Sequence, residues 1–282
     1  YDKDPFPAEI VVTQTTDLTD SNKQYTLHVR DITKHVKLQN RLKLLAYNDP
    51  LTGLYNRTYL MRTLEQLMTS AQRTQGTIAL MFLDLDQFKK INDTLGHNAG
   101  DVLLREVAKR LKQITRNSDL VARWGGDEFV IVLSGKINEQ LACKKAVEIL
   151  EIMRSPVLFG DHRLNILTSI GIAISTHADV SAERILQRAD LAMYESKKNG
   201  RNTYTLFVPQ MELEAQQQSR IENQLPGAMA NNELYLQYQP KVCCVTNQVI
   251  GFEALLRWQH PEDGFVSPAE FIPVIENSNL II

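Results

Sequence analysis

Two glycines followed by two carboxylates form the part of this chain best suited to chemistry. Residues 125–129 read Gly-Gly-Asp-Glu-Phe and join two apolar stretches. The glycines carry no Cβ atom, so the phosphate of a ligand can approach their backbone closely. Asp127 and Glu128 offer hard oxygen ligands, which Mg²⁺ commonly takes together with substrate phosphates. For the pentapeptide alone, a solvated acidic hairpin tip is the alternative interpretation.

A second acidic position follows a continuous apolar run, Thr77 to Leu83, which ends at Asp84. Such a run predicts a buried strand. Neighbouring strands lie ~4.8 Å apart, so the end of this strand and the glycine turn could share one metal ion. Downstream, Lys89 can neutralise phosphate, and the side chains of Asn92 and Asp101 can read a purine edge. These residue types favour nucleotidyl or phosphoryl transfer.

Composition excludes several classes of protein. The chain has 282 residues, a net charge of −2 and 43% hydrophobic residues, which is typical of a globular protein with room for more than one domain. It has no broad basic field to attract a nucleic acid polymer. Three cysteines cannot build a disulfide framework and favour a reduced, cytoplasmic setting. No apolar run reaches ~18 residues; a membrane segment upstream of residue 1 stays open.

The elements that must position these residues alternate between helix and strand. The patterns predict helices over 33–47, 57–73, 101–115, 139–153, 182–199 and 210–223, and strands over 9–14, 24–32, 77–83, 120–124, 129–133, 163–175 and 203–207. Such alternation predicts an α/β (α+β) fold with a central mixed sheet flanked by helices. Asp86, just after the strand that ends at Asp84, is expected to be a structural hydrogen-bond partner.

Five ordered motifs, at 49–57, 84–101, 123–129, 169–173 and 189–202, resemble those of the GGDEF-domain diguanylate cyclases. Together they cover residues 49 to about 208. The resemblance implies a nucleotidyl-cyclase or polymerase-palm-like fold and condensation of two GTP molecules into cyclic di-GMP with loss of pyrophosphate. It also implies Mg²⁺ or Mn²⁺ as the cofactor and a homodimer as the working form, because each domain would hold a single GTP.

The same resemblance implies a role for each matching residue. Metal ligands are expected at Asp84, the Leu85 carbonyl, Asp127 and Glu128. Asp127 is also the candidate base, and Lys89 and Glu128 complete the expected catalytic set. The expected substrate-binding residues are Phe88, Asn92, His97, Asp101, Gly125, Gly126, Lys197 and Arg201. For Lys197 and its neighbour Lys198, a solvated helix face is the alternative.

Arg116 and Asp119 fit the Arg-x-x-Asp pattern, nine residues before the glycine pair. In the resembled family this is an inhibitory site that binds cyclic di-GMP. Arg offers a rigid donor fork to phosphate or guanine, and Asp accepts from the guanine N–H edge. A surface ion pair is the alternative.

The flanks resemble parts of other domains. Residues 1–32 are similar to the last strands of a PAS sensor, followed by a signalling helix over 33–48 and the cyclase domain over 49–208. After a linker over 209–223, residues 224–282 resemble the start of an EAL phosphodiesterase, with Glu253 as a metal ligand. Two other functions stay open: a GTP-binding domain that tunes an EAL phosphodiesterase, and a receptor for cyclic di-GMP.

Overall fold

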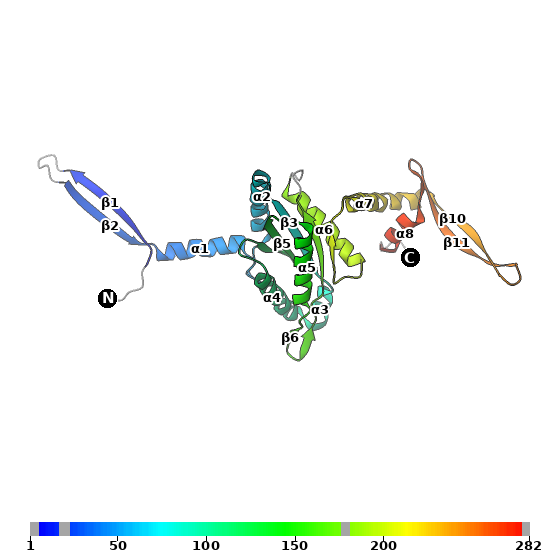
Figure 1. The fold of residues 1–282 in the computed structure, drawn as a ribbon, viewed down its shortest axis with the longest axis horizontal. Coiled ribbons are helices and arrows are strands. Elements are labelled where there is room, and N and C mark those ends of the chain that lie inside the picture. Colours follow the sequence, from blue (N-terminus) through cyan, green and yellow to red (C-terminus); the bar gives the residue numbers. More distant parts are fainter. Residues whose placement is uncertain (1–5, 17–22, 176–180, 278–282) are drawn as a thin grey trace. The chain divides into compact units, whose positions relative to one another are not determined.

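The computed structural model describes residues 6–16, 23–175 and 181–277 (Figure 1). The chain divides into two compact units, Tyr1–Leu206 and Phe207–Ile282. Each unit has its own hydrophobic core and is described by itself. Within the described residues, none of the helices combines the length and the hydropathy that crossing a bilayer requires.

A five-stranded mixed sheet organises the first unit, which confirms the predicted fold class. Its strand order is β4-β5-β3-β8-β9, and only the β8–β9 pair is parallel. The strands are β3 (Thr77–Leu85), β4 (Leu120–Gly125), β5 (Glu128–Gly135), β8 (Thr168–Ile174) and β9 (Tyr204–Leu206). The central strand, β3, is buried along nearly its whole length because both of its faces are covered.

Helices cover both faces of this sheet. On one face α2 (Arg57–Thr74) and α6 (Ala182–Lys198) contact β3. On the other, α4 (His97–Ile114) and α5 (Glu139–Met153) pack together over a core that includes alternate residues of β3. Gly171 of β8 explains how α6 comes so close, since a Cβ atom there would overlap the helix backbone at Ala189 and Met193.

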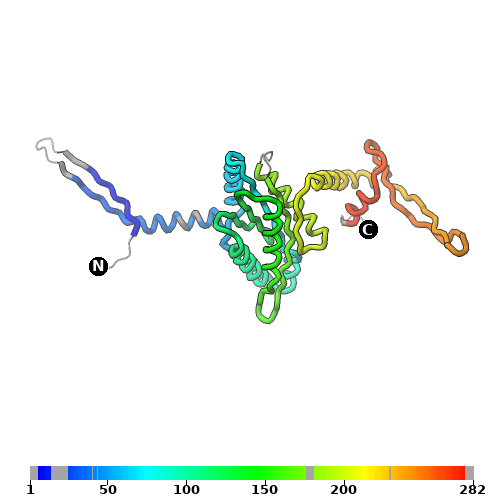
Figure 2. The backbone as a smooth tube through the Cα atoms, viewed as in Figure 1, coloured from blue at the N-terminus to red at the C-terminus, as the bar shows by residue number. Residues whose placement is uncertain are grey.

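The stretch between β3 and α4 differs from the sequence prediction. A short helix, α3 (Phe88–Leu95), precedes α4, and α4 starts at His97 rather than at the predicted residue 101. Gly96 joins the two helices with φ at 83°, in the region that favours glycine. Farther along, β6 (Val157–Phe159) and β7 (His162–Leu164) form a small hairpin that projects from the rest of the unit in Figure 2.

The first unit begins with a hairpin of β1 (Ala8–Thr16) and β2 (Lys23–Asp31), followed by α1 (Thr33–Tyr47). The hairpin's connecting residues lie outside the described ranges. The predicted apolar stripe of α1, made of Leu38, Leu42 and Leu45, is exposed. No part of the described chain covers it.

The second unit places two helices against a three-stranded antiparallel sheet. Its elements are α7 (Pro209–Ala230), β10 (Leu234–Val242), β11 (Val249–His260), β12 (Gly264–Val266) and α8 (Pro268–Asn277). The helix α7 runs beyond the predicted end at residue 223. Its last turns contribute Ile221, Leu225 and Ala228 to the core around Trp258 and Phe271.

Candidate functional site

The acidic residues meet where β3 ends beside the glycine turn. Asp84 and Glu128 are directly opposite partners in the antiparallel β3–β5 pair, so their side chains lie on the same face of the sheet. The backbone N–H of Leu85 donates to the carbonyl of Asp127 at 3.3 Å. Gly126, with φ at 50°, makes the turn between them possible. The predicted proximity of Asp84 to the glycine turn is therefore present in the fold.

Lys197 projects from the end of α6 into this acidic group. Its Nζ lies 2.7 Å from Oδ2 of Asp84, whose side chain is 11% exposed. The next residue, Lys198, instead pairs with Glu195 along the helix surface at 2.7 Å. Of these two neighbouring lysines, only Lys197 faces the carboxylates, while Lys198 has the solvated position that was the alternative for both.

The carboxylates raise one another's pKa values. Burial raises the pKa of Asp127, and the nearby negative charge of Asp84 raises it further. The pKa of Glu128 rises for the same two reasons, with smaller contributions from Asp190 and Asp127. Carboxyl groups that hold protons more tightly than usual are typical of functional sites, where a cation or a substrate is needed to balance the charge.

Asp190 is an acidic neighbour that the sequence interpretation did not single out. Burial raises its pKa, the positive charge of Lys197 lowers it, and the negative charge of Asp84 raises it again. Its position was readable from the sequence: Asp190 precedes Lys197 by seven residues, or two helical turns, which places both on one face of α6.

The donor set fits a divalent cation only in part. Among the described residues, no three His, Cys, Asp or Glu side chains converge as a metal site. Mg²⁺ commonly binds one or two protein carboxylates and takes its other ligands from water and substrate phosphates. The pair of Asp84 with Asp127 or Glu128 matches that requirement, and the expected Leu85 carbonyl belongs to the same strand end.

Arg123 is a second residue that the sequence interpretation did not assign. Its guanidinium donates to the carbonyl of Gly126 from Nη2 at 2.6 Å and from Nε at 2.9 Å. The same group pairs with Asp49 at 3.2 Å, and Asp49 also accepts hydrogen bonds from the backbone and hydroxyl of Thr52. Arg123 therefore ties the glycine turn to the segment that follows α1.

The candidate purine-reading residues lie on α3 and α4. Oδ1 of Asn92 is buried and has no hydrogen-bond partner among the described residues. A Cβ atom at Gly100 would overlap that oxygen and crowd Phe88, so glycine is what lets the side chains of Asn92 and Phe88 pack against the α4 backbone. A buried acceptor without a donor is costly unless a ligand supplies one. Asp101, one residue on, pairs only loosely with Arg105, at 3.7 Å.

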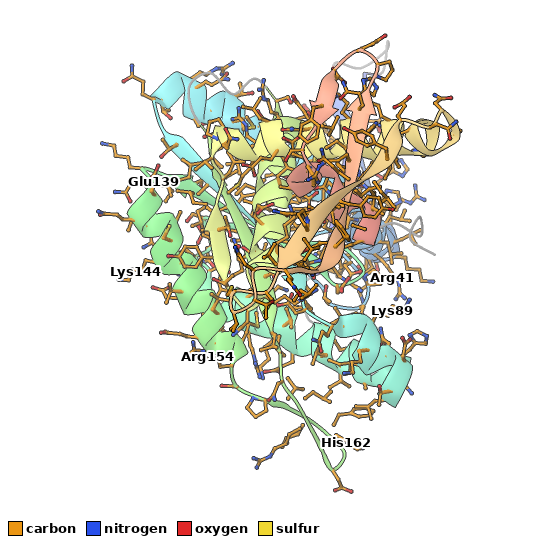
Figure 3. The ribbon with its side chains drawn as sticks, turned by 90° about the vertical axis from the view of Figure 1, so that its right-hand side faces the viewer. Arg41, Lys89, Glu139, Lys144, Arg154 and His162 are labelled. Carbon is orange, nitrogen blue, oxygen red and sulfur yellow. The ribbon has the colours of Figure 1, made fainter. Side chains whose placement is uncertain are left out.

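The remaining candidates on these helices are exposed. Lys89 and His97 are both at the surface, and Figure 3 shows Lys89 on the opposite side of the molecule from Lys144 of α5. The structure therefore leaves Lys89 free to contact a ligand but does not place it against the carboxylates. Its catalytic role stays a prediction.

Asp86 is a structural hydrogen-bond partner, as predicted. It is 7% exposed. Its Oδ1 accepts from the Ser169 hydroxyl at 2.8 Å, and its Oδ2 accepts from the backbone N–H of Asn202 at 3.0 Å. The carboxylate thereby connects the end of β3 to β8 and to the turn that carries Arg201.

A separate pocket contains the Arg-x-x-Asp pair. It is lined by Arg116, Asp119, Leu133, Ser134, Lys144 and Lys145, among others. Asp119 accepts a hydrogen bond from the backbone N–H of Arg116 at 2.9 Å, and its own N–H donates back to the Arg116 carbonyl at 3.0 Å. The pair thus forms a closed turn with the Arg116 side chain exposed, rather than the surface ion pair that was the alternative.

In the second unit, Glu253 lies on β11 directly opposite Gln239 of β10. Its side chain is exposed and pairs with Lys241 at 3.4 Å. Among the described residues, Glu253 belongs to no group of three His, Cys, Asp or Glu side chains that could hold a metal ion.

Comparisons with known proteins agree with these motifs. The family described as "Diguanylate cyclase, GGDEF domain" matches residues 46–203, and the family described as "EAL domain" matches residues 222–282. The Pseudomonas aeruginosa bifunctional diguanylate cyclase/cyclic di-GMP phosphodiesterase MucR is 38% identical over 250 residues. The Escherichia coli cyclic di-GMP phosphodiesterase PdeR is 35% identical over 252 residues. The match covers 89% of this chain but only 36% of MucR and 38% of PdeR.

Solved structures resemble the first unit. The GGDEF domain of TpbB (YfiN) from Pseudomonas aeruginosa is 34% identical, with a TM-score of 0.58, and the match covers 60% of this chain and 99% of that one. The coiled coil and GGDEF domain of DgcB from Caulobacter crescentus, solved in complex with c-di-GMP, is 28% identical with a TM-score of 0.58. That match covers 62% of this chain and 93% of DgcB's.

Proposed function

Because the chain belongs to the GGDEF-domain family of diguanylate cyclases, we propose that its first unit condenses two GTP molecules into cyclic di-GMP and releases pyrophosphate. One observation carries the proposal: the β3–β5 register sets Asp84 opposite Glu128 beside the glycine turn, and Lys197 faces the same carboxylates. Acids for a cation and a lysine for phosphate are what nucleotidyl transfer requires.

In the proposed reaction, the 3′-hydroxyl of each GTP attacks the α-phosphate of the other in turn, so that two phosphodiester bonds form and two pyrophosphates leave. Asp127 accepts the proton of the hydroxyl, and its raised pKa makes it a stronger base than an ordinary carboxylate. Asp84 together with Asp127 or Glu128, and the Leu85 carbonyl, would hold Mg²⁺ or Mn²⁺. When bound, this ion stabilises charge that develops on the phosphate oxygens.

Three basic side chains would contact the phosphates of GTP. Lys197 is held by Asp84 in the free protein, so an arriving phosphate or metal ion exchanges partners with an existing ion pair. Lys89 and Arg201 are exposed and supply further positive charge. Gly125 and Gly126 present backbone without side chains at the turn, which lets the phosphates approach it.

The space beside Asn92 would accept the guanine. The unpaired Oδ1 of Asn92 can accept from a guanine N–H, and Asp101 can do the same. Phe88 packs beside Asn92 at Gly100 and would give the base an apolar contact. His97 begins α4 at the rim of this space.

The first unit of each chain would contain one GTP site, so the first units of two chains must face each other in a homodimer for the two nucleotides to react. The exposed leucine stripe of α1 is the proposed pairing surface. The product, cyclic di-GMP, would bind in the pocket at Arg116 and Asp119 and inhibit the enzyme. The complex of DgcB with c-di-GMP supports this proposal. Residues 1–32 are the proposed end of a PAS-like sensor.

The direct test is to incubate the purified chain with GTP and Mg²⁺ and to separate the nucleotides by chromatography. We expect cyclic di-GMP from the parent protein, none after metal removal with EDTA, and a rate at least about 100-fold lower for Asp127→Ala. Lys197→Ala and Lys198→Ala form a matched pair. The first should lower the rate about tenfold or more, whereas the second should leave it within about twofold.

The absence of cyclic di-GMP among the products would favour a regulatory function over cyclase activity. Tight GTP binding without any cyclic di-GMP would indicate a regulatory domain that tunes an EAL phosphodiesterase, and the similarity to PdeR motivates that reading. Equal rates for the parent and Asp127→Ala would contradict catalysis at these carboxylates. The proposal also covers any longer protein that contains this chain. In such a protein, Glu253 would take part in the hydrolysis of cyclic di-GMP.

A further inference from the structure

The turn that follows α6 has a strained backbone. Gly200, Arg201 and Asn202 have positive φ angles of 102°, 63° and 46°. Glycine adopts such a conformation freely, but arginine and asparagine each pay about 1 kcal/mol for it. Two strained residues in succession persist only where other interactions fix the backbone, so the contacts of this turn indicate what keeps it in place.

Two hydrogen bonds hold the strained residues. The N–H of Arg201 donates to the carbonyl of Ser196 at 3.1 Å, which closes the end of α6. The N–H of Asn202 donates to the buried carboxylate of Asp86 at 3.0 Å. Asp86 lies 116 residues away in the sequence and is itself anchored, because its other oxygen accepts from the buried hydroxyl of Ser169.

The negative charge of Asp86 suits it to holding the turn through Asn202. A carboxylate accepts hydrogen bonds more strongly than a neutral oxygen, and both of its oxygens are used here. An asparagine would keep the size and could still accept from the Asn202 N–H while its NH2 group donates to the Ser169 hydroxyl, but its neutral oxygen is a weaker acceptor than a carboxylate. The negative charge of Asp86 therefore strengthens the hydrogen bond that holds the strained turn.

The turn at residues 200–202, which Asp86 holds, is next to the proposed phosphate-binding site. Asp86 is two residues beyond Asp84, and Arg201 is four residues beyond Lys197, whose Nζ contacts Asp84. The Arg201 side chain is exposed and forms no ion pair with the described residues. A free guanidinium on a rigid turn can bind a phosphate without first losing much conformational freedom.

We propose that Asp86 is a positioning residue: by holding the strained turn through Asn202, it directs Arg201 toward the phosphates of a nucleoside triphosphate bound at Asp84. This inference rests on the proposed function, since it assigns the phosphates to that site. A purely structural role would instead make Asp86 important for stability and leave the contribution of Arg201 unchanged.

The test compares Asp86→Asn, Arg201→Ala, their double variant and Ser169→Ala in the full chain. Affinity for a non-hydrolysable GTP analogue is measured by calorimetry with Mg²⁺ present, and thermal unfolding is followed in parallel. We expect Asp86→Asn and Arg201→Ala each to weaken binding about tenfold, the double variant to be no weaker than Arg201→Ala alone, and Ser169→Ala to stay within about twofold. Ser169→Ala is the matched control, because it removes one hydrogen bond to Asp86 but leaves the charged carboxylate that accepts from Asn202.

Amide hydrogen exchange gives a readout that does not depend on the nucleotide. Exchange at residues 200–203 should be faster in Asp86→Asn than in Ser169→Ala. Unchanged exchange there, unchanged affinity in Asp86→Asn, or additive losses in the double variant would each overturn the inference and leave the proposed function standing. A parent protein that fails to bind the GTP analogue would overturn both.

Discussion

At the scale of single residues, the site holds more carboxylates than positively charged side chains. Burial, and then the negative charge of Asp84, raise the pKa values of Asp127, Glu128 and Asp190, and the nearby positive charge of Lys197 lowers them only in part. Asp49 is the opposite case. Burial alone would raise its pKa, but the hydrogen bonds from Thr52 and the charge of Arg123 together lower it below the ordinary value of 3.8.

The lowered pKa of Asp49 predicts a stability difference that depends on pH. A carboxyl with a depressed folded-state pKa stabilises the fold above its unfolded pKa, and this contribution is lost as the pH falls through the folded value. We expect Asp49→Asn to lower the free energy of unfolding by about 1 kcal/mol at pH 7, a figure reduced for solvent screening. The difference should begin to shrink as the pH falls below the ordinary value and should be clearly smaller at pH 3 than at pH 7.

Urea unfolding of the parent protein and of Asp49→Asn, at pH 7 and at pH 3, measures this difference in the free energy of unfolding. Glu148→Gln is the control, because Glu148 forms an exposed ion pair with Lys145 and should cost less than about 0.5 kcal/mol at either pH. A loss of the same size at pH 7 and pH 3 for Asp49→Asn would mean that the charge of Asp49 is not what stabilises the fold.

At the scale of elements, the packing of α6 on β8 decides where Lys197 lies. Gly171→Ala would place a methyl group against the α6 backbone at Ala189 and Met193, which cannot rotate away. We expect a loss of about 3 kcal/mol in the free energy of unfolding, and cyclase activity should fall because α6 carries Lys197.

Thermal and urea unfolding measure the effect. Gly227→Ala in α7 is the matched control: no atom lies within 4 Å of its Cβ position, and alanine is the better helix former, so that variant should be neutral or slightly stabilised. Equal stability for Gly171→Ala and the parent would show that α6 is not held at this close contact.

The elements also show what the sequence could and could not predict. Helices with strong apolar periodicity, such as Glu139–Met153, matched their predicted bounds because burial of one face decides them. The separate helix α3 was missed because the Gly96 junction breaks the pattern locally. The site residues were found through their motifs, but the contacts of Arg123 with Asp49 and of Asp86 with Asn202 join distant segments and depend on tertiary pairing that local periodicity does not record.

At the scale of the whole molecule, the exposed leucine stripe of α1 is the surface proposed to join two copies. Leu38, Leu42 and Leu45 share one side of the helix, whereas Leu44, also exposed, lies on another. A charge on the stripe would be placed in an apolar interface, but a charge at Leu44 would stay in water.

We therefore expect Leu42→Glu to raise the dimer dissociation constant at least about tenfold, and Leu44→Glu to leave it within about threefold. Sedimentation equilibrium measures this directly. The rate of cyclic di-GMP formation per chain should fall in parallel for Leu42→Glu at low protein concentration. Identical self-association of the two variants would show that α1 does not pair through this stripe.

The direct opposition of Asp84 and Glu128 also limits how the domain can change in length during evolution. Adding or deleting one residue inside β3 would shift every later side chain to the other face of the sheet. Asp84 would then point into the apolar layer beneath α4 and α5. Insertions and deletions in descendants of this domain are therefore expected in connections such as the exposed Gly160–Asp161 turn between β6 and β7, while the strands that carry the acids change only by substitution.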